Sequence, residues 1–272
     1  MKRLLLVICL AVIPLPLLGV QFSSLRDLLP SSGSGGYGGV DGSEFVFARL
    51  IYNEGLGGGG LANFRGFRRG GGSWRTDWPE ADKHLGIAID RMSNVRVVLD
   101  QDIAIEIMDP NLFSYPFLYA LEVGRGMNLS QEEADRLREY MARGGFLVID
   151  DFWGSREWQN WAIQLGKIFP EKEPEPIPIA HPLFHSFFDI DEILQIPNVN
   201  NGCRGGPTYE QDGYVPYALG MFDDDRRLMM LINYNTDIGD AWEHADQPCY
   251  PNEFADYAFR IAINYIIYSM TH

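Results

Sequence analysis

The stretch 128–154, NLSQEEADRLREYMARGGFLVIDDFWG, constrains the fold most, because it reads as a helix, a tight turn and a buried strand. Ser130 and Glu133 have the spacing of a capping box, which predicts that a helix begins there. The glycines at 144–145 can end that helix in a left-handed turn. The run FLVI at 146–149 is apolar throughout, as in a strand covered on both faces of a parallel sheet.

The rest of the chain continues this alternation of helices and strands. Hydrophobic periodicity predicts further strands at 45–52, 95–99, 117–123, 190–199, 217–222 and 227–234, and further helices at 77–94, 155–169 and 253–270. The segment 171–178 should be extended, and 235–251 should be an acidic loop. This order of elements predicts one α/β domain with a doubly wound, mostly parallel sheet and helices on both faces.

The N-terminus has the layout of a secretory signal. Lys2 and Arg3 precede an apolar run at 4–20, so a signal peptide is expected at 1–23. Two prolines interrupt the run, which is short for a bilayer span, so we expect no stable membrane span after cleavage. The protein should then be exported, to the periplasm or outside the cell; an uncleaved N-terminal anchor is the alternative. A flexible linker is expected at 24–43 and the α/β domain at 44–272.

Charge and cysteine content exclude some classes of partner and leave others open. A net charge of −15 disfavours a nucleic-acid partner, because no basic stripe offsets the repulsion from phosphates. Beyond the signal, the chain keeps Cys203 and Cys249. In an exported protein they can form a disulfide, and two free thiols are the alternative. No cofactor and no metal are predicted.

Asp150 and Asp151 are the first candidates for chemistry, because they stand at the carboxyl end of the buried strand. Open α/β sheets place their ligands at that end. If both carboxyl groups were buried, repulsion would raise one pKa and supply an acid and a base. The alternative is structural: one aspartate caps the helix that follows, and the other is solvated.

A glycine-rich stretch at 53–73 leads into the next candidates. It lacks the spacing of a phosphate-binding loop, which favours a surface insertion. Arg75 and Asp77 follow it and should lie at the same edge of the sheet. Asp77 could bind a ligand or cap the helix at 77–94, with Glu80 completing a capping box. Arg75, like Arg49, could pair with carboxylates, bind an anion or only hold the fold.

His181 is the histidine best suited to act as a general base, since it precedes a proline and its backbone is held extended. A histidine that is satisfied by a backbone carbonyl is the alternative. A run of oxygen-bearing side chains at 233–243 includes Asn235 and Asp237 and should reach the same rim as Asp150. Calcium is conceivable there, but the EF-hand spacing fails because its glycine position holds Ile238.

Four tryptophans lie beside these rim segments: Trp74, Trp78, Trp153 and Trp242. Flat aromatic faces beside carboxylates and amides line many carbohydrate sites, so we include Trp153 and Trp242 among the candidate ligand contacts. Their alternative role is in the core.

Six blocks in order carry a family resemblance: FVFARLIY, WRTDWPEAD, YPFLYALE, LREYMARGGFLVIDD, HPLF and NYNTDIGDAWE. Across about 44–270 the chain resembles the bacterial domain of unknown function 4159. That family is similar to the class I glutamine amidotransferase-like superfamily with its ThuA-like branch, which implies a flavodoxin-like fold. The turn after 146–149 carries Asp150, Asp151 and Phe152 instead of a catalytic cysteine, so glutaminase activity is not expected.

These observations leave three hypotheses. The first is an exported domain that binds a small polar ligand, such as a carbohydrate, or a partner protein at the carboxyl edge of the sheet. The second is a hydrolase or metal-assisted enzyme that uses Asp150 or Asp151 with His181, Asp77 and Asp237. The third is an interaction subunit of a cell-envelope complex that docks through the glycine-rich stretch.

Overall fold

The computed structural model describes residues 44–55, 73–99 and 101–272, and they form a seven-stranded sheet in the order β2-β1-β3-β4-β7-β6-β5. The strands are β1 (Ala48–Ile51), β2 (Ile103–Glu106), β3 (Phe117–Leu121), β4 (Phe146–Asp150), β5 (Glu175–Pro176), β6 (Tyr217–Phe222) and β7 (Leu228–Tyr234). The five neighbours from β2 to β7 pair in parallel, whereas β6 is antiparallel to β7 and β5 is antiparallel to β6. The predicted flavodoxin-like α/β fold with a mostly parallel sheet is confirmed.

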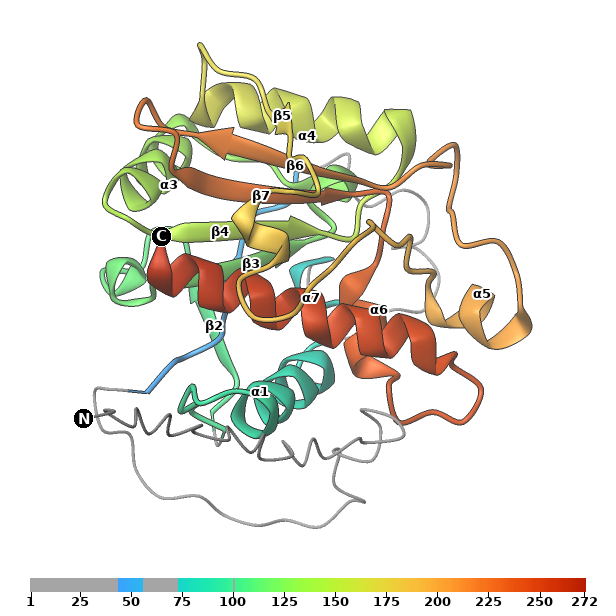
Figure 1. Cartoon of the computed structure of the whole chain (residues 1–272). Helices are drawn as coiled ribbons and strands as arrows, with labels where there is room; N and C mark the ends of the chain where they lie inside the picture. The colour runs from blue at the N-terminus through green and yellow to red at the C-terminus, as the bar shows by residue number, and fades with distance from the viewer. Residues whose placement is uncertain (1–43, 56–72, 100) are drawn as a thin grey trace, which may run out of the picture.

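Helices cover both faces of this sheet (Figure 1). One face packs against α1 (Glu80–Met92), α6 (Ile238–Glu243) and α7 (Asn252–Thr271); the other packs against α2 (Val123–Gly126), α3 (Gln131–Ala142) and α4 (Gly154–Ile168). Shorter elements are α5 (Val199–Arg204), η3 (Ser73–Arg75), η4 (Leu112–Ser114) and η5 (Pro182–Phe184). Among the described residues, no helix is both long enough and apolar enough to cross a bilayer.

The stretch 128–154 folds as predicted. The Ser130 hydroxyl accepts from the Glu133 amide at 3.1 Å, and the Glu133 carboxylate accepts from the Ser130 amide at 2.7 Å, which completes a capping box. Gly144 has φ 104°, so a side chain there would be strained. All residues of β4 are buried, because helices cover both faces of this strand.

Three local predictions differ from the structure. The strand predicted at 95–99 makes only one bridge, Val97 to Phe45, and β2 proper begins at Ile103, opposite Ala48. The segment 190–199 is not a strand. The loop predicted at 235–251 contains α6, whose apolar residues pack against the core cluster of α1 and α7.

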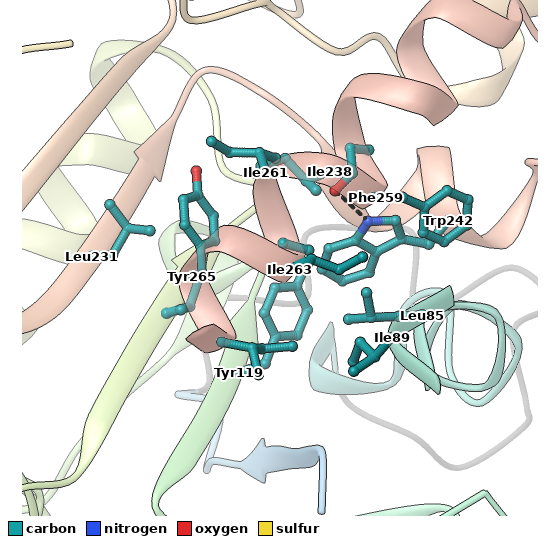
Figure 2. Close-up of a cluster of buried hydrophobic side chains, with 14 of the residues drawn as sticks. Leu85, Ile89, Tyr119, Leu231, Ile238, Trp242, Phe259, Ile261, Ile263 and Tyr265 are labelled. Carbon is teal, nitrogen blue, oxygen red and sulfur yellow. Dashed lines mark hydrogen bonds between the residues drawn. The ribbon is translucent and has the colours of Figure 1, made fainter. Parts of the chain in front are cut away.

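Trp242 anchors α6 to this core. Its indole lies among Leu85, Ile89 and Phe259 in Figure 2, and its Nε1 donates to the carbonyl of Ala258 at 3.0 Å. The residue is 2% exposed, so its burial fixes the position of α6 against the sheet. A disulfide between Cys203 and Cys249 ties α5 to the segment that precedes α7.

Candidate functional site

The turns that follow the parallel strands share an unusual backbone conformation. In the described part of the chain, six non-glycine residues have positive φ, and four of them belong to these turns or to the loop that leads into α1: Asp77 (62°), Glu122 (57°), Asp151 (49°) and Asn235 (62°). Left-handed backbone costs energy for residues with a Cβ, and such strain is concentrated at functional sites. The strained turns occur where β3, β4 and β7 end, at one edge of the sheet.

Carboxylates gather at this edge. Asp150 ends β4 and Asp151 follows it, Asp237 and Asp240 come from the segment after β7, Glu122 directly follows β3, and Asp77 lies in the loop before α1. We call these six residues the carboxylate cluster: Asp77, Glu122, Asp150, Asp151, Asp237 and Asp240. All are buried except Asp77, which is half-buried. Separate loops meet here because parallel strands end at the same edge.

Asp150 is fully buried and joins three elements. Its Oδ2 accepts from the Tyr119 hydroxyl at 2.5 Å and from the amides of Ile238 and Gly239 at 3.0 and 3.2 Å. Its Oδ1 has no hydrogen-bond partner within the described ranges. Burial raises the pKa of Asp150 to about 6 even though these hydrogen bonds lower it. Asp150 therefore does not cap the helix that follows β4, as the structural alternative proposed, and instead accepts amides from the first turn of α6.

Asp151 occupies the strained turn between β4 and α4. Its Oδ1 accepts from Nε1 of Trp153 at 2.9 Å. Burial raises the pKa of Asp151 to about 8; Arg125 lowers it, and the charge of Asp150 raises it further. The two adjacent aspartates therefore favour different protonation states near neutral pH.

Asp77 does not cap α1. That helix begins at Glu80 and has no side-chain cap, because Pro79 occupies the N-cap position. The carboxylate instead lies over α6: a Cβ atom added at Gly239 would be 2.7 Å from Asp77 Oδ2 and 3.1 Å from the Tyr119 hydroxyl. Burial, and next the charge of Asp240, raise the pKa of Asp77 well above its usual range. Its buried Oδ2 has no hydrogen-bond partner among the described residues.

Asp237 caps α6, and Asp240 connects the first turn of α6 to α5. Asp237 Oδ1 accepts from the Asp240 amide at 2.9 Å as the N-cap of α6. Asp240 Oδ2 accepts from the Val199 amide at 2.6 Å. Burial, together with the charge of Asp151, raises the pKa of Asp237 well above its usual range.

Two arginines border the carboxylate cluster. Arg49 on β1 is fully buried, is paired with Asp82, and donates to the carbonyls of Thr76 and Trp74, so it positions the loop that carries Asp77. It therefore has the fold-holding role that the sequence left open. Arg125 pairs with Glu122 at 2.5 Å and lies 3.7 Å from Glu157.

The other predicted ligand contacts have varied surroundings. Asn235 accepts from the Gly154 amide at 2.9 Å and donates to the Val215 carbonyl at 2.7 Å, which ties the turn after β4 to that after β7. Trp153 and Trp242 are 0% and 2% exposed, so both indoles belong to the interior. The exposed Arg75 lies over the half-buried rings of Trp74 and Trp78, at 5.6 and 4.9 Å from the ring centroids.

His181 does not join the carboxylate cluster. Its ring contacts Phe222, at the end of β6, and Tyr268 near the end of α7. Phe222 pairs with Leu228, the first residue of β7, so this is the opposite edge of the sheet. His181 Nδ1 accepts from the Leu183 amide at 3.2 Å and caps η5. The predicted convergence of His181 with Asp77, Asp150 and Asp237 is therefore wrong for the histidine, and the three aspartates come together without it.

Sequence reasoning did not include Tyr119, Glu122 and Gly239 in the site. One usable signal was Glu122, the first charged residue after the apolar strand at 117–121. Tyr119 reads as a core residue, and its role depends on the neighbouring strand. The arrangement as a whole can accept hydrogen bonds from a ligand, hold positive charge and exchange protons near neutral pH.

Comparison with known proteins assigns a family and no activity. No curated protein matched the chain. The sequence pattern described as "Domain of unknown function (DUF4159)" matches residues 47–270, which includes every residue of the carboxylate cluster. The chain therefore belongs to the DUF4159 family.

Proposed function

We propose that this domain binds a small polar ligand at the carboxyl edge of its sheet, through the carboxylate cluster. The observation that carries this proposal is the convergence of buried carboxylates from separate loops, on backbone held in left-handed conformations. A fold does not need so many like charges in one place, since burying carboxylates costs free energy. Buried carboxyl groups with perturbed pKa values are concentrated at binding and catalytic sites.

The chemistry of the cluster narrows the ligand class. A carboxylate accepts hydrogen bonds and a protonated carboxyl group can also donate one, so a ligand rich in hydroxyl or amino groups suits this cluster. The half-buried rings of Trp74 and Trp78, with centroids 5.8 Å apart, belong to the same loop as Asp77, and Arg75 lies over both rings. An apolar ring face beside a carboxylate suits a carbohydrate.

A place in the class I glutamine amidotransferase-like superfamily, near the ThuA-like branch, fits this proposal. The flavodoxin-like sheet and the sharp turn after β4 support it. The turn carries Asp151 where a cysteine nucleophile would be needed, and the two described cysteines form a disulfide. The binding function that we propose therefore does not include glutaminase activity.

We further propose that the protein is a bacterial, exported protein that works in the periplasm or outside the cell. The signal-like pattern at 1–23, which lies outside the described residues, supports export. The disulfide supports an oxidising compartment. An envelope protein is the alternative partner to a small ligand; the glycine-rich stretch proposed as its docking arm lies almost entirely outside the described residues.

A hydrolase is the second candidate function, and the turn at Asp151 favours it. A strained strand-to-helix turn presents the nucleophile in the α/β-hydrolase fold. Here the turn places one aspartate with a pKa of about 8 beside another with a pKa of about 6, a pairing that suits an acid and a base. His181 lies at the opposite edge of the sheet, so it takes no part in this chemistry.

A thermal-shift screen with neutral sugars, amino sugars and nucleotides tests the binding proposal. A ligand at 100 times its Kd should stabilise the chain by roughly 2.7 kcal/mol. Asp151→Asn should remove the shift, whereas Asp224→Asn, at an exposed carboxylate that pairs with Lys172, should preserve it. A ligand whose shift is the same in the wild type and in Asp151→Asn would contradict a site at the carboxylate cluster.

A further inference from the structure

Three members of the carboxylate cluster have the geometry of a cation site. Asp77, Asp237 and Asp240 each offer one carboxylate oxygen, and these oxygens lie within 4.8 Å of one another. Oxygen ligands bind Ca²⁺ at about 2.3–2.6 Å, so two oxygens on opposite sides of one ion are up to about 5 Å apart. A single ion can therefore contact all three side chains without a change in the backbone.

A second observation, independent of the spacing, points to a ligand at this place. The Oδ2 atom of Asp77 is buried and lacks a hydrogen-bond partner in the described part of the chain. It faces Gly239, which lies between Asp237 and Asp240 in the first turn of α6. A buried carboxylate oxygen without a partner costs more free energy than the loss of an ordinary hydrogen bond. A bound cation would remove that cost.

The amide donors in the first turn of α6 are already used. The amides of Ile238 and Gly239 donate to Asp150, and the amide of Asp240 donates to Asp237. The charge of Arg49 is matched by Asp82. The positive end of α6 and the adjacent arginine therefore explain the positions of Asp150, Asp237 and Asp82, but they do not supply a partner for Asp77.

We propose that Asp77, Asp237 and Asp240 bind one hard divalent cation, of the class of Ca²⁺, Mg²⁺ or Mn²⁺. The donor atoms are all carboxylate oxygens, which these ions prefer over softer metals. The ion deepens the binding function proposed above and rests on it: it would hold the loop of Asp77 against α6 and present open coordination positions to the hydroxyl groups of a polar ligand.

A neighbouring group provides an internal comparison. Asp240 also lies close to Glu243 and His244, with 3.4 Å between its Oδ1 and His244 Nε2. An imidazole in the set suits transition metals better than calcium. Variants at Asp77 and at His244 therefore separate the proposed site from its neighbour, because each residue belongs to one group only.

Isothermal titration of the chelator-treated chain with Ca²⁺, Mg²⁺ and Mn²⁺, each alone, tests the site. We expect one bound ion per chain, and we expect Asp77→Asn to weaken binding by about tenfold or more, since affinity follows the charge of the ligands. His244→Gln should change the Kd by less than about threefold. No binding at millimolar metal, an unchanged Kd in Asp77→Asn, or loss of binding in His244→Gln alone would overturn the proposal.

Unfolding in urea without metal shows that the variant is folded. Asp77→Asn removes a like charge and should keep or raise the stability of the metal-free chain while it loses the metal-induced gain. If it instead unfolds, Asp240→Asn and Asp237→Asn give the same comparison. The sugar and nucleotide screen is then repeated with chelator present, which separates the two proposals. If the chain binds an organic ligand but no metal, only the cation proposal is rejected. If it binds metal but no organic ligand, only the polar-ligand proposal is rejected.

Discussion

Tyr119 on β3 donates its hydroxyl hydrogen to Asp150 on β4, with 2.5 Å between the two oxygens. The same Asp150 oxygen accepts two amides from α6, so a single atom connects two central strands to the helix that carries Asp237 and Asp240. Tyr119 is 1% exposed and its ring packs on Trp242 at 5.3 Å. Tyr119 and Asp150 therefore join the carboxylate cluster to the hydrophobic core, and this packing holds the cluster in place.

Tyr119→Phe should destabilise the chain by about 1–3 kcal/mol, because Asp150 loses a buried donor to its carboxylate. The pKa of Asp150 should rise further, since the hydroxyl lowers it. Urea unfolding measures the first effect and its pH dependence the second. Tyr140→Phe is the matched control: that hydroxyl donates to the Phe146 carbonyl at 3.3 Å, at the other edge of the sheet. Equal pH profiles in the two variants would show that Tyr119 does not act on the site.

Stability of the metal-free chain should fall as the pH rises from about 4 to about 8. Asp150 and Asp151 have raised pKa values of about 6 and about 8 in the folded chain, so that chain holds more protons than the unfolded chain throughout this interval. The two protonated groups make their full contribution to stability below the pKa that they have in the unfolded chain. That contribution is lost as the pH rises through their pKa values in the folded chain. Between pH 5 and pH 8 the free energy of unfolding should fall by at least about 2 kcal/mol, as measured by urea unfolding with chelator present. Asp151→Asn should flatten the upper part of the curve; a wild-type curve that rises with pH would contradict the burial of these groups.

Arg49→Met should cost about 3–5 kcal/mol, because Asp82 remains buried without its partner. Replacing both residues, with Arg49→Met and Asp82→Leu, should restore most of that stability. Ligand affinity should stay low in the double variant, since the carbonyls of Trp74 and Thr76 lose the donor that positions Asp77. Arg226→Met, which breaks an exposed pair with Glu175, should leave both stability and affinity essentially unchanged, because solvent screens exposed ion pairs. If the double variant recovered ligand affinity as well as stability, Arg49 would have no positioning role.

Gly239→Ala should reduce binding while the chain remains folded. Alanine stabilises most exposed helix interiors by about 1 kcal/mol relative to glycine. At this position its Cβ would lie 2.7 Å from Asp77 Oδ2, so the carboxylate must move away. Gly166→Ala in α4 is the control, because a Cβ there meets nothing within 4 Å. Similar affinity in both variants would mean that Asp77 does not need its place over α6.

The sequence predicted the sheet better than it predicted the connections. Buried parallel strands such as β4 are apolar throughout, so their pattern is strong, and the capping box at Ser130 fixed a helix start. The helix α6 was missed because its six residues are too few for a periodic signal. Local spacing left Asp77 as either a ligand contact or a helix cap, and its position over Gly239 depends on the buried Arg49 and on tertiary packing. His181 was assigned from residue chemistry alone, which carries no information about the edge of the sheet on which it lies.

Hydrogen–deuterium exchange with a ligand from the screen or the divalent ion tests the central claim most directly. We expect simultaneous slowing in peptides that cover 74–79, 122–126, 150–154 and 235–241, four segments distant in sequence that meet at one edge of the sheet. Exchange near 181–185 and 222–228, at the opposite edge, should not change. Protection confined to the opposite edge, or to only one of the four segments, would contradict a shared binding site at the carboxylate cluster.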